Sequence, residues 1–358
     1  MVICTWVPGK TQINGKEVAE MYYTGIDLHK KTSFLTTVDE KGHIVTRANL
    51  LNVESDIMDY FVELDHETKI VIESTASWYW LYDLLVGNGF DVVISNPLKT
   101  KAIASAKIKN DKVDSHMLAQ LLRSDLISTV YVSSLEVRKL KELLRHRERL
   151  VRDATRMKNR IHNLLMKNNE QVPFSDLFGV QGLRYLNEIG LPPYHRVQVE
   201  TYLSLYQDLV TEIEPLTETV HALAEEQPMA NLLMSIPGIG AIVAMSLVAE
   251  IGDISRFPSY RHLASYAGLV PSLDASGGKE RRGSITKRGS RYLRTALIQS
   301  AHAIPRMKKC RLNLFFRRRI VKAGYKKAIV ATAHKILQIV FYVLKNQTPY
   351  REEYPACA

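Results

Sequence analysis

The stretch from residue 21 to residue 48, MYYTGIDLHKKTSFLTTVDEKGHIVTRA, decides the fold of the first part of the chain. Its apolar and polar residues alternate, and the turn sequence DEKG at 39–42 separates the two halves, so the pattern predicts a β-hairpin. The elements that follow are an amphipathic stretch at 54–65, an apolar run at 69–73, a helical run at 78–88 and a strand at 91–95. Because strands and helices alternate, the sequence predicts a mixed α/β sheet.

The composition is that of an ordinary globular protein, with 46% hydrophobic and 24% charged residues among 358. This length is enough for two domains of roughly 100–200 residues each. The three cysteines, Cys4, Cys310 and Cys357, form no CxxC motif or Cys/His cluster, so no disulfide framework or structural zinc site is expected. With no signal-peptide pattern and no apolar stretch of about 18 residues, we expect a cytoplasmic protein that does not enter a membrane.

Positive charge is concentrated near the C-terminal end. The whole chain carries a formal net charge of +11, which favours a polyanionic partner, and nucleic acid is the leading candidate. From Lys279 to Lys327 there are 17 Lys and Arg residues against a single acid, Glu280. The rest of the chain is therefore net acidic, and we expect the polyanion to be held mainly by this basic segment.

A long amphipathic helix is predicted over 136–168. Its apolar residues recur at intervals of three, four and seven, the spacing of a coiled-coil seam: Val137, Leu140, Leu144, Val151, Ala154, Ile161 and Leu165. A second amphipathic stretch lies at 199–226. The two helices could pair as an arm between domains or join protomers, and the sequence does not choose between these arrangements.

Four carboxylates form a pattern with chemical meaning. Asp27 lies inside an apolar strand, where a carboxylate is disfavoured, and Glu73 ends the apolar run KIVIE. Pairing of 69–73 with 23–27 would bring these two acids together. Asp111 and Asp114 are three residues apart at the beginning of the helix DKVDSHMLAQLLR, which places them on one helix face.

A cluster of four carboxylates requires cations, and ligation by oxygen alone suits Mg²⁺, or Mn²⁺, rather than zinc. Two such ions can assist phosphodiester cleavage. Each acid also has an ordinary explanation, as a helix cap, a strand end or a surface charge. The order strand, strand end, helix is nevertheless the order in which RNase H-like nucleases supply their metal ligands.

The stretch SIPGIG at 235–240 predicts a tight turn between two helices. Gly238 and Gly240 would let the turn and the following helix amides approach a phosphate closely. The pattern fits a helix-hairpin-helix element, which binds the DNA backbone without sequence preference, and it also fits a simple corner between two helices.

A basic loop followed by a helix is predicted after this turn. Ser276 lies between Ala275 and Gly277 on an unobstructed backbone, and a serine there can attack a phosphate whose charge is offset by cations. The predicted nucleic-acid-binding residues of this segment are Lys279, Arg281, Arg282, Lys287, Arg288 and Arg291. Ser272, Ser284 and Ser290 are rival nucleophiles, and the sequence identifies no general base.

Five motifs occur in one order: YTGIDLHK, VIES, NDKVDSHMLA, SIPGIG and GLVPSLDASGGKERRGSITKRGSRYLR. With them, residues 22–345 resemble the IS110 family of insertion-sequence transposases, the DEDD-type recombinases related to the DNA invertase Piv. Where the family usually has Ala-Thr-Gly after the second acid, this chain has Ser74, Thr75 and Ala76. About 20 residues precede the region of resemblance and have no assigned role.

The resemblance implies a three-part organisation. A RuvC-like, RNase H-fold catalytic domain would span 20–133, a helical coiled-coil linker and oligomerisation arm 134–228, and a mainly α transposase domain with the helix-hairpin-helix 229–348. Asp27, Glu73, Asp111 and Asp114 match the catalytic, metal-binding acids of the family, and Ser276 matches its serine nucleophile.

The resemblance also implies the mechanism and the partners. The serine would attack DNA to form a phosphoserine intermediate, with Mg²⁺ bound nearby. The partners would be donor and target DNA, a structured noncoding guide RNA and further copies of the chain, as a dimer or tetramer.

Two other readings stay open. A RuvC-like Holliday-junction resolvase would use the same acids and would need no serine domain. A non-catalytic DNA- or RNA-binding protein would use the basic segment alone.

Overall fold

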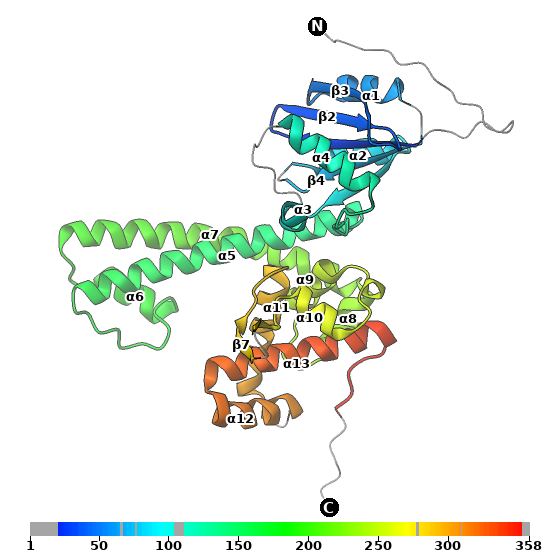
Figure 1. The fold of residues 1–358 in the computed structure, drawn as a ribbon. Helices are drawn as coiled ribbons and strands as arrows, with labels where there is room; N and C mark the ends of the chain where they lie inside the picture. Colours follow the sequence, from blue (N-terminus) through cyan, green and yellow to red (C-terminus); the bar gives the residue numbers. More distant parts are fainter. Residues whose placement is uncertain are drawn as a thin grey trace, which may run out of the picture. The chain divides into compact units, whose positions relative to one another are not determined.

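The computed structural model describes residues 21–64, 67–75, 77–103, 111–276, 279–308 and 310–352; the side chains of Ala102 and of residues 273–282 are outside this description. The chain divides into two compact units, and the boundary lies between Val132 and Ser133. Figure 1 shows the elements of each unit. The helices of the predicted arm share a core with the C-terminal part, so both belong to the second unit. The three predicted domain limits stay predictions.

The first unit is built on a five-stranded sheet with the order β3-β2-β1-β4-β5. Its strands are β1 (Tyr22–Leu28), β2 (Thr32–Val38), β3 (Ile44–Leu51), β4 (Thr68–Glu73) and β5 (Asp91–Ser95). The first three strands are antiparallel, while β4 is parallel to both β1 and β5. The predicted mixed sheet is therefore confirmed, and β4 pairs with β1, as convergence of Asp27 and Glu73 would require.

The prediction of a single hairpin over 21–48 is wrong, because this stretch forms three strands. A turn at His29–Lys31 separates β1 from β2, and the DEKG turn joins β2 to β3. The first turn is closed by a hydrogen bond from the His29 amide to the Thr32 carbonyl, at 3.0 Å. In the second, the Asp39 side chain accepts hydrogen bonds from the backbone amides of Lys41 and His43. The polar run HKKTS at 29–33 interrupts the alternation at the first turn, and the prediction overlooked this signal.

Helices cover both faces of this sheet. The helices are α1 (Glu54–Val62), α2 (Tyr79–Gly87), α3 (Pro97–Ile103) and α4 (Asp111–Arg123). On one face, Ile57 and Phe61 of α1 and Leu85 of α2 share a core with Ile26 and Ile72 of the sheet. Helix α4 packs on β1, β2 and β4. The amphipathic helices thus bury their apolar stripes against a sheet whose central strands are buried on both sides.

The second unit begins with a long helical arm. Its helices are α5 (Leu135–Lys167), α6 (Val180–Glu188) and α7 (Pro193–Glu225). α5 and α7 lie side by side and antiparallel, because Ile161 near the end of α5 shares a cluster with Val199 near the beginning of α7. At their other ends, Leu144 and Val220 join the C-terminal core. The two predicted long helices are present, while coiled-coil packing between them stays a prediction.

The C-terminal part is mainly helical. Its elements are α8 (Pro228–Met234), α9 (Ala241–Ile251), α10 (Tyr260–Tyr266), β6 (Pro271–Ser276), β7 (Lys279–Ile285), α11 (Arg291–Ala303), α12 (Arg311–Ala323) and α13 (Tyr325–Asn346), with short 3₁₀ turns at Ile254–Arg256 and Ile304–Arg306. The segment predicted as a basic loop is instead an antiparallel hairpin of β6 and β7. Its strands carry few apolar residues, so no alternation marks them, and backbone pairing defines them.

Helix α13 is the one helix of the described residues that is long and apolar enough to cross a membrane. Just over half of its most apolar window, 56%, is buried inside the protein. Ile336, Leu337 and Phe341 lie in the C-terminal core. This burial is what a core helix requires. Cys310, which precedes α12, is buried and unpaired, and burial raises the pKa of its thiol; Cys4 and Cys357 lie outside the described residues.

Candidate active-site residues

The carboxyl ends of β1 and β4 lie side by side. Ile26 of β1 pairs with Ile72 of β4, and the next residues on these two strands are Asp27 and Glu73. Asp27 is buried, with 7% of its surface exposed, whereas Glu73 is half-buried. The sheet therefore delivers the two acids to one edge, as the sequence predicts.

Gly25 explains how α4 reaches this edge. A Cβ atom at position 25 would lie 2.1 Å from the backbone carbonyl oxygen of Ser115 and 2.6 Å from the backbone nitrogen of Ala119. Both are backbone atoms that cannot turn aside, so only glycine allows the helix to pack this closely. The Ser115 and Thr36 hydroxyls form a buried hydrogen bond of 2.8 Å beside it. This close contact sets the first turn of α4 against the end of β1.

Three side chains converge there. The Nε2 atom of His29 lies 3.3 Å from Oδ2 of Asp27 and 3.3 Å from Oδ2 of Asp111. Potential ligand atoms of the three residues all lie within 4.8 Å of one another. The side chains of His29 and Asp111 are about half exposed, so the cluster opens to solvent above the buried Asp27. Strand, turn and helix thus each contribute one potential metal ligand.

Glu73 and Asp114 lie outside this group of three, although both belong to the described residues. Convergence of all four predicted acids therefore stays a prediction. His29 was missed because a continuous strand over 21–37 would place it far from any strand end. Its signal was present in the motif IDLH, where an acid and a histidine two residues apart flank the last residue of the strand.

The donor set fits a divalent cation. Carboxylate oxygens suit Mg²⁺ and Mn²⁺, and an imidazole nitrogen extends the set toward transition metals. A cation bound here would offset the negative charge of the Asp27 and Asp111 carboxylates.

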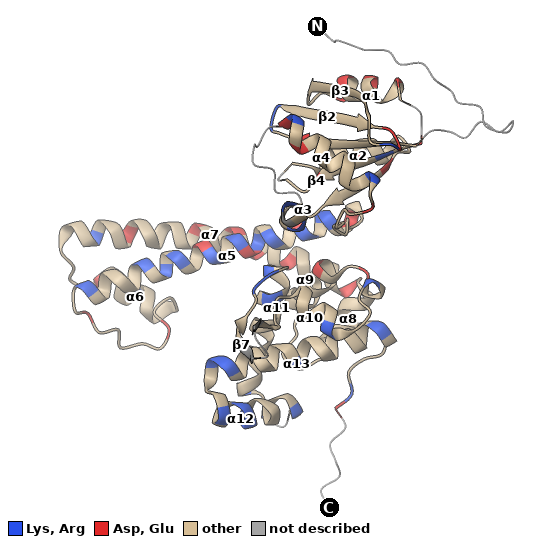
Figure 2. Ribbon diagram, in the orientation of Figure 1, with Lys and Arg blue, Asp and Glu red and all other residues tan. Residues whose placement is uncertain are grey.

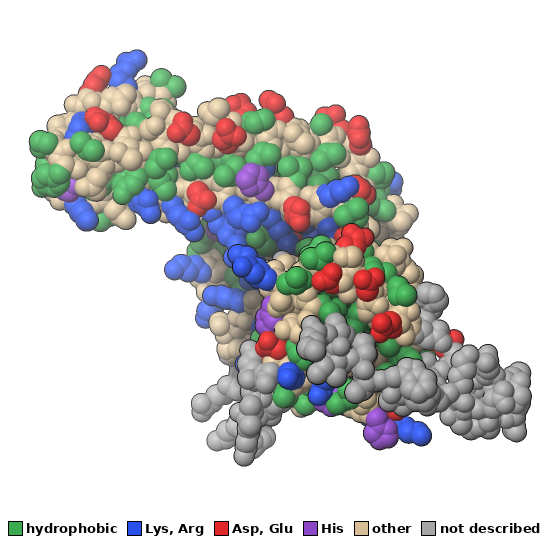
Figure 3. Space-filling view, turned by 90° about the horizontal axis from the view of Figure 1, so that it is seen from above, with side chains coloured by type: hydrophobic (Ala, Val, Ile, Leu, Met, Phe, Trp, Pro, Cys, Tyr) green, Lys and Arg blue, Asp and Glu red, His purple; other side chains and the backbone are tan. Residues whose placement is uncertain are grey.

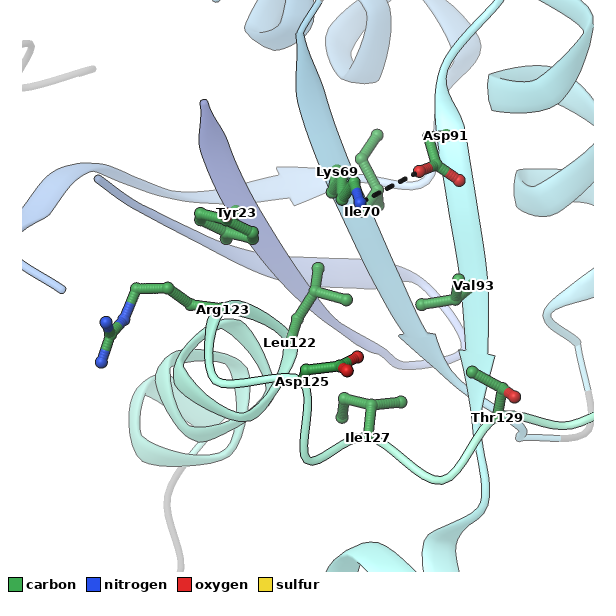
Figure 4. A pocket seen from close by; sticks show the side chains of 10 residues that line it. All are labelled: Tyr23, Lys69, Ile70, Asp91, Val93, Leu122, Arg123, Asp125, Ile127 and Thr129. Atoms are coloured by element: carbon green, nitrogen blue, oxygen red, sulfur yellow. Dashed lines mark ion pairs between the residues drawn. The ribbon is translucent and has the colours of Figure 1, made fainter. Parts of the chain in front are cut away.

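A different hollow lies at the other end of the sheet. It measures about 340 Å³ and is lined by Tyr23, Lys69, Asp91, Arg123 and Asp125, among others. Figure 4 shows that these side chains come from the beginnings of β1, β4 and β5 and from the end of α4. Lys69 and Asp91 form an exposed ion pair of 3.9 Å. Asp27, His29 and Asp111, hereafter called the acid site, do not line this hollow, so it is not part of the candidate metal centre.

The β6–β7 hairpin carries Ser276 in the second unit. Ser276 is the last residue of β6 and pairs with Lys279, the first residue of β7. The side chains of Ser276, Lys279, Arg281 and Arg282 lie outside the described residues, and so do Gly277 and Gly278. Lys287, Arg288 and Arg291, at the base of the hairpin, are exposed.

The base of the hairpin is tied to the helical core. The Thr286 amide donates to the Val270 carbonyl at 2.9 Å, and the Ser290 amide donates to the Tyr266 carbonyl at 2.9 Å. Gly289 has φ +88°, and a Cβ atom there would lie 2.1 Å from the Tyr266 carbonyl oxygen. The position of the hairpin is therefore set by backbone contacts that need glycine.

The rival serines differ in their surroundings. Ser290 caps α11, because its hydroxyl accepts a hydrogen bond from the Leu293 amide at 3.1 Å and donates one to Glu250 at 2.9 Å. A hydroxyl engaged in this way is poorly placed to act as a nucleophile. Ser272 and Ser284 are exposed in the two strands of the hairpin.

The two glycines of the SIPGIG turn have different environments. Gly238 has φ +85°, and a Cβ atom there would lie 2.7 Å from the Ser300 carbonyl oxygen, so the fold itself requires this glycine. Gly240 precedes α9, is exposed and has open space around it. Only Gly240 has the free surroundings that close approach of a phosphate would need. The helix-hairpin-helix assignment stays a prediction.

Comparison with protein families gives two matches. A model of the DEDD transposases of the IS110 group matches residues 24–168, and a model described as the transposase IS116/IS110/IS902 family matches residues 230–316. Together the two regions cover more than half of the chain. The chain belongs to this transposase family.

Full-length relatives agree with the assignment. The transposase of insertion sequence IS1111A from Coxiella burnetii is 27% identical over 348 residues, covering 94% of this chain and 93% of the relative. The pilin gene-inverting protein of Moraxella lacunata is 27% identical over 346 residues, covering 92% and 97%. The IS1328 transposase of Yersinia enterocolitica is 26% identical over 282 residues, covering 77% and 82%. The similarity therefore spans both units of the transposase.

Family membership gives the first unit its fold and its chemistry in outline. A DEDD transposase domain implies an RNase H-like fold, which the mixed sheet with helices on both faces matches. The same domain, together with the cluster of Asp27, His29 and Asp111, indicates a divalent metal ion. The transposase is thus an enzyme whose acid site lies within its first unit.

Proposed function

We propose that this transposase cuts and rejoins DNA at the ends of an insertion sequence, with Ser276 as the nucleophile and the acid site as the metal centre. The observation that carries the proposal is the convergence of Asp27 and Asp111 from a strand and a distant helix, in a chain of this family. Polar ligands from separate elements, gathered around a buried acid, are what a metal centre requires. The family relation extends over the hairpin that carries Ser276.

In this proposal Asp27 and Asp111, with Glu73 and Asp114 beside them, hold Mg²⁺, or Mn²⁺. When bound, the metal ion offsets negative charge on a phosphate and on the oxygen that leaves it. Asp27 anchors the site from the sheet, and Asp111 joins it from the first turn of α4. The half-exposed His29 lies at the open side of the cluster, within reach of both carboxylates.

Ser276 would form a covalent bond to DNA. Its hydroxyl oxygen attacks the scissile phosphorus and gives up its proton to a base, and one deoxyribose oxygen leaves and takes up a proton. A second deoxyribose oxygen then attacks the phosphoserine, which rejoins DNA and frees the serine. Lys287, Arg288 and Arg291 at the base of the hairpin, with Lys279, Arg281 and Arg282 nearer its tip, would offset phosphate charge.

The partners follow from the same relation. Donor and target DNA are the substrates, and we propose a structured noncoding RNA as guide and assembly of the transposase as a dimer or tetramer. The transposase would act in the cytoplasm, on the nucleoid. The dense positive charge of the C-terminal segment supports a nucleic-acid partner.

A second candidate is a RuvC-like endonuclease that cuts branched DNA with the acids alone. The observation in its favour is that the whole cluster of Asp27, His29 and Asp111 lies within the first compact unit. On this reading the hairpin would bind DNA and would not react with it.

The two candidates are separated by one experiment. The full chain is incubated with Mg²⁺ or Mn²⁺, DNA containing the junction of the element and RNA transcribed from its end, and protein attached to DNA is sought on a denaturing gel. We expect an adduct with the wild type that is absent in Ser276→Ala and retained in Ser272→Ala and Ser284→Ala. Cleavage without an adduct, unchanged in Ser276→Ala and lost in Asp27→Asn, would establish the endonuclease instead.

A further inference from the structure

The two long helices of the arm carry opposite charge. α5 has eleven Lys and Arg residues against four acids, whereas α7 has six acids against one Arg. Figure 2 shows Lys and Arg concentrated along the α5 ribbon, and in the space-filling view of Figure 3 basic and acidic side chains gather along opposite edges of the arm. The arm therefore has one basic edge and one acidic edge, although neither helix lies in the segment to which the sequence assigns DNA binding.

Five arginines of α5 form a continuous row. They are Arg145, Arg149, Arg152, Arg156 and Arg160. Their spacing of three or four residues places them on one face of a helix, opposite the apolar stripe that includes Ala154 and Ile161. At 1.5 Å per residue the row is about 22 Å long. We call this set the arginine row.

Neighbouring groups hold several guanidinium groups of the row in place. Arg145 lies over the ring of Tyr292 at 4.5 Å and pairs with Glu250 at 2.7 Å. Arg160 lies over the ring of Tyr202 at 5.2 Å. Arg152 and Arg156 pair with Glu148 and Asp153 of α5 itself. These three acids do not balance five arginines, so the row keeps a net positive charge on side chains that are already ordered.

The outer part of the row is open to solvent. Arg149 and Arg160 are exposed, and 68% of the Arg156 side chain is exposed. A planar guanidinium group presents a rigid fork of N–H donors that matches the oxygens of a phosphate. Because these side chains project from one helix face, they can meet a linear array of anions.

We propose that the arginine row binds the phosphate backbone of duplex DNA, as a contact surface separate from the basic C-terminal segment. The proposal rests on the proposed function for its DNA substrate. A duplex carries one charge about every 1.7 Å of its axis, so a row of about 22 Å laid against it has several phosphates within reach. The acidic edge formed by α7 repels DNA, which restricts binding to the α5 side.

The charge densities favour DNA over a second copy of the arm as the occupant. Duplex DNA presents a charge about every 1.7 Å along its axis. The six acids of α7 are spread over 33 residues, a length of about 50 Å. One of them, Glu200, already lies 3.9 Å from Arg196 of the same helix. The arginine row therefore gains much more from DNA than from α7 of another copy.

The test measures how DNA affinity depends on salt. The full chain with Arg149→Ala, Arg156→Ala and Arg160→Ala is titrated with a duplex of random sequence, without metal. Each lost phosphate contact reduces the slope of log affinity against log salt by about 0.9, so the triple variant should lose about 2.7, and affinity near 0.1 M salt should fall at least about tenfold. The matched control removes three exposed cations outside α5, by Lys41→Ala, Lys99→Ala and Arg184→Ala, and should change the slope much less.

Replacement of the same three arginines by lysine keeps the charge and should restore most of the slope, which excludes a merely structural effect. An unchanged slope in the alanine variant overturns the proposal. Weakened binding of single-stranded RNA with unchanged duplex binding also overturns it, as does a change in oligomeric state alone. The salt dependence is measured without catalysis, so it does not depend on Ser276. A missing Ser276 adduct would therefore refute the proposed function without affecting the conclusion about the arginine row.

Discussion

The acid site and the β6–β7 hairpin that carries Ser276, here called the serine hairpin, are built in contrasting ways. The acid site takes one side chain each from β1, the following turn and α4, and it exists only because α4 packs closely over Gly25. The hairpin is local: β6 and β7 are consecutive, and backbone hydrogen bonds fix its base. The acid site should therefore respond to changes in core packing, and the serine hairpin to changes at the joint where it meets α11.

The largest effect is expected from Gly25→Ala. The new Cβ atom would overlap backbone atoms of α4, so the helix must move and the first unit should lose about 3 kcal/mol or more of stability, at the upper end for overpacking. Binding of Mn²⁺, measured by calorimetry, should be lost as Asp111 moves from Asp27. Gly87→Ala in α2 is the control, because nothing lies within 4 Å of its Cβ position. A Gly25→Ala protein with wild-type melting and metal binding would contradict this account.

The hairpin counterpart is Glu250→Ala. Glu250 is buried, with 3% of its surface exposed, and it accepts hydrogen bonds from Arg145 of α5 and from Ser290. Breaking a buried ion pair costs about 3–5 kcal/mol, and because a third of Arg145 is exposed we expect about 2–3 kcal/mol. Adduct formation by Ser276 should fall while Mn²⁺ binding is retained. Glu225→Ala, at an exposed site in α7, serves as control.

Ser290→Ala should have a smaller effect on the same joint. It removes the hydroxyl that caps α11 by accepting from the Leu293 amide, a loss of about 1 kcal/mol. Ser259 also occupies an N-cap position, before α10, but its side chain forms no cap hydrogen bond. Ser290→Ala should therefore lower the melting temperature more than Ser259→Ala does. Equal decreases in the two variants would contradict a stabilising cap at Ser290.

The smallest effect concerns pH. Burial, and to a lesser degree the charge of Lys335, lower the pKa of His334 from its ordinary 6.5. The unfolded chain then takes up a proton at higher pH than the folded chain, so this contribution to stability is complete above pH 6.5 and is lost as pH falls below it. Melting measured on both sides of pH 6.5 should show a smaller decrease in His334→Gln than in the wild type. Lys335→Ala removes only the lesser cause and should reduce the decrease slightly.

Apolar runs were enough to predict β4, β5 and α4, whereas β1 and β2 were predicted as one continuous strand. The parallel pairing of β1 with β4 follows from two apolar runs that each end in an acid, and the confirmed register places Asp27 and Glu73 at one edge. The turn at 29–31 was missed although the polar run at 29–33 interrupts the alternation, because DEKG at 39–42, with Asp and Gly, is the stronger turn signal. That error also concealed His29, which reaches Asp27 only when the chain reverses there.

Other features could not be predicted because they depend on tertiary contacts or on the backbone alone. The strands β6 and β7 are polar, and only their backbone pairing defines them. Gly238 was predicted to serve phosphate binding, whereas its packing against Ser300 involves a residue far along the chain. Glu250 forms an ion pair with Arg145 and a hydrogen bond with Ser290, two residues far from it in the sequence, and no local pattern indicates these contacts.

The turn that carries His29 also has a practical consequence for protein engineering. The backbone of His29 is fixed by hydrogen bonds that do not involve the imidazole. Its amide donates to the Thr32 carbonyl, and its carbonyl accepts from the Asn52 side chain. The ring can thus be exchanged for a carboxylate or an amide without disturbing the hydrophobic core. In the proposed metal centre, substitution at position 29 would change the metal preference from a surface turn, while the buried Asp27 stays in place.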